Sequence, residues 1–184
     1  MSKHLPLALF LLICLMAGWG LQQQNLQQPN QLTSQLAPHL TSKSPKADYQ
    51  FSLPDLDGKP HHSSEWDASL LIVNFWASWC GPCLEEMPRF IELQTRYANQ
   101  GVQFIGIGID QAEPLRKIVD RLGVNYPVLQ GDFEAMEVAK KFGNTYGVLP
   151  YTSILNRNGE LIHEIAGGVK PGEMELLIKQ LLKP

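Results

Sequence analysis

The chain has 184 residues, of which 44% are hydrophobic and 18% are charged, the ordinary composition of a globular protein. A formal net charge of −3 excludes the strongly basic surface that binds nucleic acid, so we expect no nucleic-acid partner. The three cysteines exclude a framework of structural disulfides, because Cys14 lies in an N-terminal apolar run and a single pair, Cys80 and Cys83, remains. The composition therefore predicts one globular domain with one C-x-x-C pair.

Residues 1–21 have the pattern of a membrane-targeting segment. Lys3 precedes an uncharged run from Leu5 to Leu21, and such a run occurs both in secretory signal sequences and in short membrane anchors. Both alternatives stay open, and the length of the run and its poor cleavage site favour an uncleaved anchor. Lys3 on the short side of the run predicts that the rest of the chain crosses the membrane. We therefore expect a periplasmic or otherwise extracytoplasmic protein, secreted or anchored to the inner membrane.

Residues 22–47 are predicted to be a flexible linker. This stretch is rich in Gln, Asn, Ser, Thr and Pro, and its leucines have no regular spacing. It cannot bury enough apolar surface to offset the entropy of ordering, although a weak polar helix over residues 21–36 is an alternative. The folded domain is therefore expected to span residues 48–184.

Two near-continuous apolar runs predict the central strands of this domain. Residues 70–76 and 102–109 contain few polar side chains, as expected of strands buried on both faces of a sheet. Residues 49–53 alternate apolar and polar side chains, which predicts a half-buried strand before a turn at Asp57-Gly58. Further strands are expected over residues 126–130, 152–156 and 161–166, the last two joined as a hairpin across Arg157-Asn158-Gly159.

Four helices follow from the spacing of apolar residues. The first is predicted to begin near Cys80, and the second extends to Leu122 with Asp110 and Glu113 as a capping box. The other two are expected over residues 133–142 and from Pro171 to the C-terminal region. Helices between strands imply right-handed crossovers and a parallel sheet centre, to which the hairpin adds an antiparallel edge. We therefore predict a single α/β domain with a central mixed sheet and flanking helices.

The segment from Phe75 to Cys83, Phe-Trp-Ala-Ser-Trp-Cys-Gly-Pro-Cys, resembles the active-site signature of the thioredoxin superfamily. The resemblance implies a thioredoxin-like fold and thiol–disulfide exchange. At the start of a helix, Cys80 would face unpaired N–H groups and the positive end of the helix dipole, which stabilise a thiolate. Cys83 lies one turn further on the same side and can close a disulfide. We expect Cys80 to attack the substrate and Cys83 to resolve the mixed disulfide, with no cofactor beyond this pair.

Glu86 and Pro88 extend the motif to Cys-x-x-Cys-x-x-Glu-x-Pro, which is similar to the TlpA/ResA-like branch of that superfamily. Members of this branch are exported, often membrane-tethered reductases with an inserted helix, which implies that residues 113–122 form that helix. The resemblance also implies that Glu86 tunes the thiols or accepts their protons; a solvated glutamate in the first helical turn is the alternative. Thioredoxin proper has an aspartate where this chain has Asn74, and asparagine cannot take a proton at neutral pH.

Leu149-Pro150 is a second mark of the superfamily, which has a cis-proline before a strand and beside the cysteine pair. The resemblance implies that Pro150 is cis and that the main chain of Leu149 pairs with an extended segment of the substrate. A trans proline in a turn is the alternative. We expect Trp79 to be an exposed aromatic wall for docking partners, whereas Trp76 is expected in the core.

These residues predict an enzyme that reduces protein disulfides outside the cytoplasm, with the haem-binding cysteines of apocytochromes as one candidate substrate. The Gly-Pro dipeptide resembles that of reducing members, and a reductase in an oxidising compartment needs electrons from a membrane partner. A dithiol oxidase of the same fold is the close alternative. A carrier of a metal such as copper is a second, but His61, His62 and His163 are expected to face solvent and no convincing third ligand accompanies the cysteines. We expect no metal site and a monomeric protein.

Overall fold

The structure of the chain is a computed structural model that describes residues 49–183. The predicted leader, residues 1–21, and the predicted linker, residues 22–47, lie outside the described residues. Within residues 49–183, none of the helices is both long enough and apolar enough to cross a bilayer.

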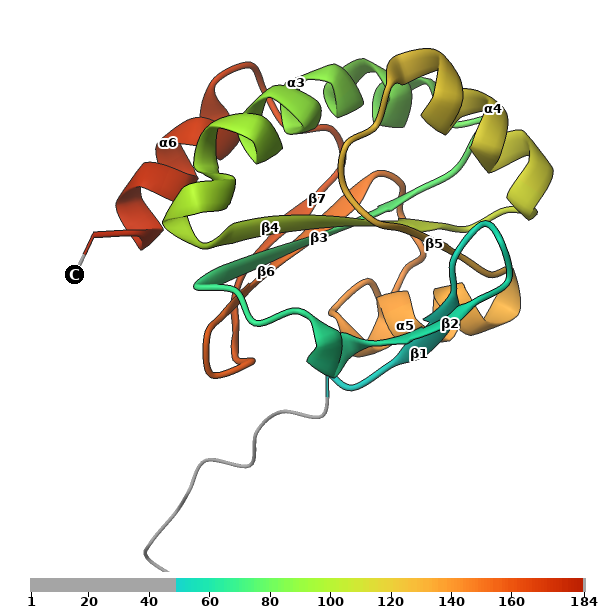
Figure 1. The fold of residues 1–184 in the computed structure, drawn as a ribbon, viewed down its shortest axis with the longest axis horizontal. Coiled ribbons are helices and arrows are strands. Elements are labelled where there is room, and N and C mark those ends of the chain that lie inside the picture. The colour runs from blue at the N-terminus through green and yellow to red at the C-terminus, as the bar shows by residue number, and fades with distance from the viewer. Residues whose placement is uncertain (1–48, 184) are drawn as a thin grey trace, which may run out of the picture. The chain divides into compact units, whose positions relative to one another are not determined.

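A five-stranded mixed sheet forms the centre of the domain, with the strand order β5-β4-β3-β6-β7 (Figure 1). β3, β4 and β5 run parallel, and the antiparallel pair of β6 and β7 lies on the other side of β3. This is the predicted arrangement of a parallel centre with an added hairpin. The strands comprise Leu70–Trp76 (β3), Val102–Gly108 (β4), Val128–Gln130 (β5), Tyr151–Asn156 (β6) and Leu161–Ala166 (β7).

Helices cover both faces of this sheet (Figure 1). α3, α4 and α6 pack on one face, and α5 packs on the other face together with the short hairpin of β1 (Ser52–Pro54) and β2 (Pro60–His62). Each helix begins close to its predicted position, and α4 lies where the inserted helix was expected. The helices comprise Gly81–Tyr97 (α3), Ala112–Leu122 (α4), Phe133–Lys141 (α5) and Glu173–Leu181 (α6).

The central strand β3 shows how the sequence builds a core on each side of the sheet. All seven of its residues are buried, and successive side chains of a strand point to opposite faces. Ile72 and Trp76 pack in the cluster that contains α3, α4 and α6, whereas Val73 and Phe75 pack in the cluster that contains α5. A strand covered on both faces needs apolar side chains at almost every position, which explains the near-continuous run. Asn74 is the polar exception and belongs to the site described below.

The first strand differs from the prediction. β1 spans Ser52–Pro54 rather than residues 49–53, and it pairs with an unpredicted strand, β2, over Pro60–His62. The Asp55 carboxylate holds the turn between them by accepting 2.9 Å hydrogen bonds from the backbone N–H groups of Asp57 and Lys59. Because Asp55 holds this turn, the residues on either side of it, Pro54 and Pro60, pair with each other, and the hairpin begins there.

His61 does not face solvent as expected. Its Nδ1 lies 2.7 Å from Oε2 of Glu65 and its Nε2 lies 3.1 Å from Oδ2 of Asp55. Hydrogen bonds to Glu65 first, and to Asp55 second, raise the pKa of the imidazole. His62 and His163 are exposed, as predicted. The prediction failed for His61 because the hairpin turn brings Asp55 to one ring nitrogen and the helical turn after β2 brings Glu65 to the other.

The predicted capping box of Asp110 and Glu113 is wrong. α4 begins after Gln111, whose side chain makes no capping hydrogen bond. Asp110 instead accepts a hydrogen bond from Ser78 Oγ, and another at 2.8 Å from the backbone N–H of Gln111. The Asp110 carboxylate therefore binds the hydroxyl of Ser78, 32 positions away in the sequence, and does not cap the helix as the local motif predicts.

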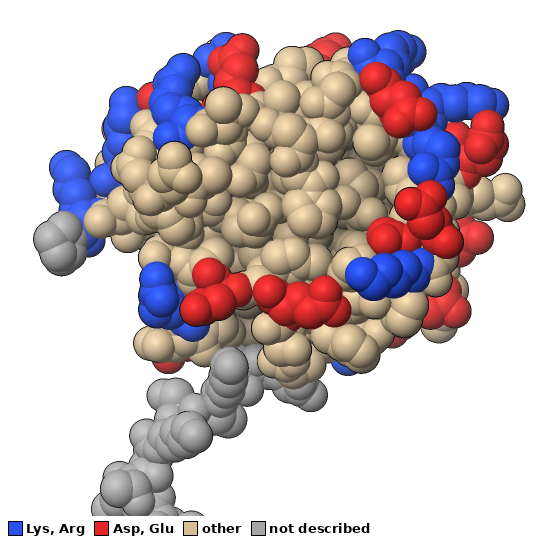
Figure 2. Space-filling model, viewed as in Figure 1, with Lys and Arg blue, Asp and Glu red and all other residues tan. Residues whose placement is uncertain are grey.

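The surface carries charges of both signs. On the face drawn in Figure 2, Lys and Arg side chains lie among Asp and Glu side chains around the rim, and uncharged residues fill the middle. Neither sign forms a separate patch on this face.

Candidate active site

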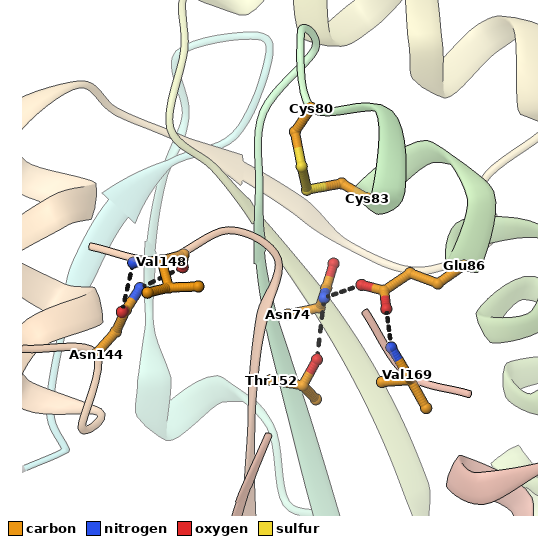
Figure 3. Close-up of a disulfide and its surroundings, with 8 residues drawn as sticks. All are labelled: Asn74, Cys80, Cys83, Glu86, Asn144, Val148, Thr152 and Val169. Atoms are coloured by element: carbon orange, nitrogen blue, oxygen red, sulfur yellow. Dashed lines mark hydrogen bonds between the residues drawn. A yellow bond between two sulfur atoms is a disulfide. The ribbon is translucent and has the colours of Figure 1, made fainter. Parts of the chain in front are cut away.

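Cys80 and Cys83 form a disulfide at the start of α3 (Figure 3). Their Cα atoms are 5.3 Å apart. Cys80 is the N-cap residue, and Gly81 and Pro82 lie in the first turn of the helix. A proline is well tolerated there, because the first N–H groups of a helix have no acceptor within the helix. The structure thus has both the disulfide and the helix start that the motif predicts.

The two cysteines differ in burial. Cys80 retains 6% exposure, whereas Cys83 is fully buried. A substrate can therefore approach Cys80 first, and the unpaired N–H groups of the first helical turn favour its thiolate. This asymmetry suits the expected order, in which Cys80 attacks and Cys83 resolves.

The loop between β3 and α3 presents one tryptophan and buries another. Trp79 is 71% exposed beside the disulfide, whereas Trp76 is fully buried in the core. The backbone N–H of Cys80 donates a 3.1 Å hydrogen bond to the carbonyl of Ala77. The hydrogen bond from Ser78 to Asp110 ties the same loop to the second residue after the end of β4. The exposed aromatic surface of Trp79 is therefore carried by an anchored loop.

Glu86 is buried near the disulfide and is not solvated (Figure 3). Its Oε1 accepts a 2.9 Å hydrogen bond from Nδ2 of Asn74, and its Oε2 accepts a 2.9 Å bond from the backbone N–H of Val169. Asn74 also donates to Oγ1 of Thr152 at 3.1 Å. One carboxyl therefore joins β3, α3 and the segment before α6, and the alternative of a solvated first-turn glutamate is wrong.

Burial raises the pKa of Glu86 to about 7, against the hydrogen bonds from Val169 and Asn74, which stabilise the carboxylate. An acid with a pKa near neutrality can both accept and release a proton there. Cys83 and Glu86 are three positions apart on α3 and share one face of the helix. Glu86 can therefore serve as the proton acceptor that the asparagine at position 74 cannot be.

Pro150 lies at the same end of the sheet as the cysteine pair. The Leu149–Pro150 peptide bond is cis, and β6 begins at the next residue. In the register of β6 against β3, Tyr151 lies opposite Phe75, close to the end of β3 that leads to Cys80. Leu149 is partly buried and packs against both hydrophobic clusters. The fold thus brings together the residues that the two motifs had singled out separately.

Asn144 holds the loop before Pro150, and sequence reasoning missed it (Figure 3). The buried side chain donates from Nδ2 to the carbonyl of Val148 at 2.8 Å and accepts at Oδ1 from the N–H of Val148 at 2.9 Å. Gly143 has a φ of 98°, and a Cβ there would overlap the Glu164 carboxylate. A Gly-Asn pair after a helix is a C-cap signal, but it does not reveal that the amide clamps a residue further along.

A disulfide whose first cysteine caps a helix, at the end of a central strand in this sheet, belongs to the thioredoxin-like class of thiol:disulfide oxidoreductases. Comparison with known proteins agrees with that class. The family model described as Redoxin matches residues 35–180. Because this match covers more than half of the chain, the protein belongs to the Redoxin family.

Relatives and solved structures make the assignment narrower. The thiol-disulfide oxidoreductase ResA of Halalkalibacterium halodurans is 30% identical over 73% of this chain and 74% of its own. The protein of the same name from Bacillus thuringiensis is 29% identical over 71% of this chain and 74% of its own. A thiol:disulfide interchange protein of the thioredoxin family from Chlorobium tepidum is 28% identical, with a TM-score of 0.64 over 73% of this chain and 94% of that one. The predicted ResA-like thiol:disulfide oxidoreductase is thereby confirmed.

Proposed function

We propose that this enzyme reduces protein disulfides outside the cytoplasm, with Cys80 as the nucleophile and Cys83 as the resolving thiol. The observation that carries the proposal is the asymmetry of the pair. Cys80 caps a helix and keeps 6% exposure, whereas Cys83 has none and lies on the face of α3 that also carries Glu86. The cycle needs no further cofactor, because the two thiols themselves hold the electrons.

In the proposed cycle, the Cys80 thiolate attacks one sulfur of the substrate disulfide, and the other sulfur leaves as a thiolate. Cys83 then loses its proton and attacks Cys80. The Cys80–Cys83 disulfide forms as the bond to the substrate breaks, so two electrons pass from the enzyme to the substrate. Glu86 is assigned the proton of Cys83, since it is buried on the same side of α3 and titrates near neutrality.

Substrate binding is assigned to Trp79, Leu149 and Pro150. Trp79 offers exposed aromatic surface next to the nucleophile. The main chain of Leu149 is proposed to pair with an extended segment of the substrate, as in strand addition. The clamp from Asn144 to Val148 supports this assignment, because it holds the residue just before Leu149.

The proposed location is the periplasm or the extracytoplasmic face of the inner membrane. Its support is the apolar run from Leu5 to Leu21 behind Lys3. In an oxidising compartment the disulfide formed in each cycle must be reduced again, so a membrane electron donor is part of the proposal. We further propose a monomer that acts on substrates such as the cysteines of apocytochromes.

Cys83→Ser in cells tests this function. The variant keeps the attacking thiol and loses the release step, so mixed disulfides between Cys80 and its substrates should accumulate and can be identified. The double variant Cys80→Ser, Cys83→Ser is the matched control and should capture nothing. Native protein held mainly as the dithiol is expected of a reductase, whereas a mainly disulfide form would indicate an oxidase. If nothing is trapped and the native pair never changes redox state, the proposed function is wrong.

A further inference from the structure

A small cavity lies beside Glu86, between α3 and the segment that leads into α6. Its volume is about 90 Å³, and its wall includes Glu86, Arg89, Val169 and Lys170. A cavity of this volume has room for several water molecules. Its lining contains neither cysteine and none of the proposed docking residues Trp79, Leu149 and Pro150. The residues of the cavity wall are therefore distinct from those proposed to contact the substrate.

Glu86 connects this cavity to the surroundings of Cys83. One carboxyl oxygen accepts from Asn74 on β3, which is the sheet side of the site, and the other accepts from the N–H of Val169, which lines the cavity. Cys83 has no exposed surface, whereas Glu86 retains 6%. A proton that leaves Cys83 cannot pass directly to bulk water, but one held by Glu86 has solvent beside it.

The ionisable groups near Glu86 differ between its cavity side and its core side. Arg89, Lys170 and Glu85 are exposed residues that line the cavity. In the core, burial and the nearby Glu86 raise the pKa of the Tyr126 phenol, so it stays neutral. The two cations on the cavity side favour release of a proton in that direction, since they stabilise the carboxylate that remains.

We propose that this cavity is the route by which Glu86 exchanges its proton with solvent while a substrate covers the disulfide. The inference rests on the proposed function, because it concerns the step in which Cys83 resolves the mixed disulfide. In that step the Cys83 thiol gives its proton to the Glu86 carboxylate, and the thiolate attacks Sγ of Cys80. The Cys80–Cys83 bond forms, and the bond to the substrate sulfur breaks. The substrate leaves as a thiolate that takes a proton from solvent, and Glu86 releases its proton into the cavity.

Chemical rescue of Glu86→Ala tests the route. The reduced full chain is mixed with a small aromatic disulfide whose released thiolate absorbs light, so a first release reports attack by Cys80 and a second reports resolution by Cys83. The variant should slow the second release by about tenfold or more. Acetate should restore that rate with saturation, whereas pivalate, of similar basicity but greater bulk, should not, because the cavity has a volume of only about 90 Å³.

Three results separate the inference from the proposed function. Equal rescue by both carboxylates, or slowing without rescue by either, overturns the cavity route. An undiminished second release in Glu86→Ala overturns the route and also the proton-accepting role of Glu86. If native protein gives no second release at all, the proposed dithiol cycle itself fails, and the route fails with it.

Surface variants test the same route while Glu86 stays in place. Arg89→Glu and Lys170→Glu each put a negative charge on the cavity wall and change no core residue. The pH midpoint of the second release should rise by about half a pH unit in each. Arg121→Glu, at the exposed end of α4 and away from the cavity, is the matched control and should leave the midpoint unchanged. Equal shifts in all three variants would contradict the route.

Discussion

The environment of Glu86 has two opposite effects on the pKa of its carboxyl group. Two hydrogen bonds, from Asn74 and from the backbone of Val169, stabilise its carboxylate, while removal from water favours its protonated form. Removal from water is the larger effect, so the pKa rises from 4.5 to about 7. A carboxyl in this range changes its charge near neutral pH, which makes both the stability and the thiol chemistry of the protein depend on pH.

Glu86→Gln should remove a pH dependence of folding. Between pH 4.5 and about 7 the folded chain keeps a proton on Glu86 that the unfolded chain has lost, so the free energy of unfolding falls as pH rises. Over the whole window, native protein should lose about 3 kcal/mol that the glutamine variant does not lose. Urea unfolding of the oxidised proteins at several pH values measures the difference.

The comparison with the variant is itself the control, because His61 and the other titrating groups are common to both proteins and cancel in the difference. Parallel stability curves for the two proteins between pH 4 and 8 would show that Glu86 has an ordinary pKa.

The same variant should change the titration of the thiols. Above its own pKa, Glu86 carries a negative charge close to the cysteine pair, and a like charge opposes formation of a thiolate. In the reduced protein, Glu86→Gln should therefore lower the apparent pKa of the pair by about one unit. The ultraviolet absorbance of the thiolate follows the titration. An unchanged curve would remove the tuning role assigned to Glu86.

At the scale of elements, the loop from α5 to β6 contains the main chain of Leu149, which is proposed to pair with the substrate. The Asn144 side chain holds the loop at Val148 through two hydrogen bonds, while Tyr146 between these residues is 93% exposed. The clamp from Asn144 to Val148 uses both polar groups of one side chain on one residue. The loop can therefore present a defined main chain to a substrate without belonging to a strand.

Asn144→Ala should impair the reduction of protein disulfides more than that of small ones. Without the clamp, the main chain before Pro150 loses its fixed geometry, so KM for a protein substrate should rise about tenfold, the equivalent of about 1.4 kcal/mol. The rate with a small aromatic disulfide should stay unchanged, because that substrate reacts with the thiols and does not need to pair with the main chain of Leu149. Steady-state kinetics with the two substrates measures the split.

Ser153→Ala is the matched control for this variant. Ser153 is also buried, and its Oγ donates a 2.9 Å hydrogen bond to the carbonyl of Phe142 and not to Val148. Each variant should lose about 1–2 kcal/mol of stability. A rise in KM for protein substrates with both variants would mean that general destabilisation, and not the clamp, is responsible.

Elements that depend on local pattern were predictable, and those that depend on distant partners were not. β3 runs from Leu70 to Trp76 as its apolar run predicts, since burial on both faces leaves that pattern in the sequence. β2 was missed because Pro60–His62 has no alternating apolar pattern, although the turn before it, held by Asp55, is local and was predicted. The capping box failed because Ser78 bonds the carboxylate of Asp110.

The same distinction holds within the site. Cys80, Cys83 and Pro150 lie in short motifs that can be recognised along the chain. The burial of Glu86 depends on the backbone of Val169, 83 positions away, so no local pattern could decide between a buried and a solvated acid. The clamp by Asn144 is short-range, but no sequence signal distinguishes it from an ordinary loop asparagine.

At the scale of the whole molecule, the sheet is enclosed by two hydrophobic clusters that consist of residues from Phe51 onward. The N-terminal edge of the described chain belongs to the cluster on the α5 side. There the Tyr49 and Phe142 rings meet with centroids 5.1 Å apart, and Phe51 packs against Phe142 at 5.8 Å and against Trp66 at 6.1 Å. These contacts predict where the independently folding unit begins.

A chain that begins at Asp48 should unfold at the same urea concentration as the full chain, whereas one that begins at Ser52 should not. The shorter chain lacks the Tyr49 and Phe51 rings and the backbone hydrogen bond from Ser63 to Phe51. Loss of a buried aromatic side chain costs about 3 kcal/mol or more. Both chains keep the cysteine pair, so the reaction with a small aromatic disulfide controls for an intact site. Equal unfolding midpoints for the two truncated chains would place the start of the domain after Phe51.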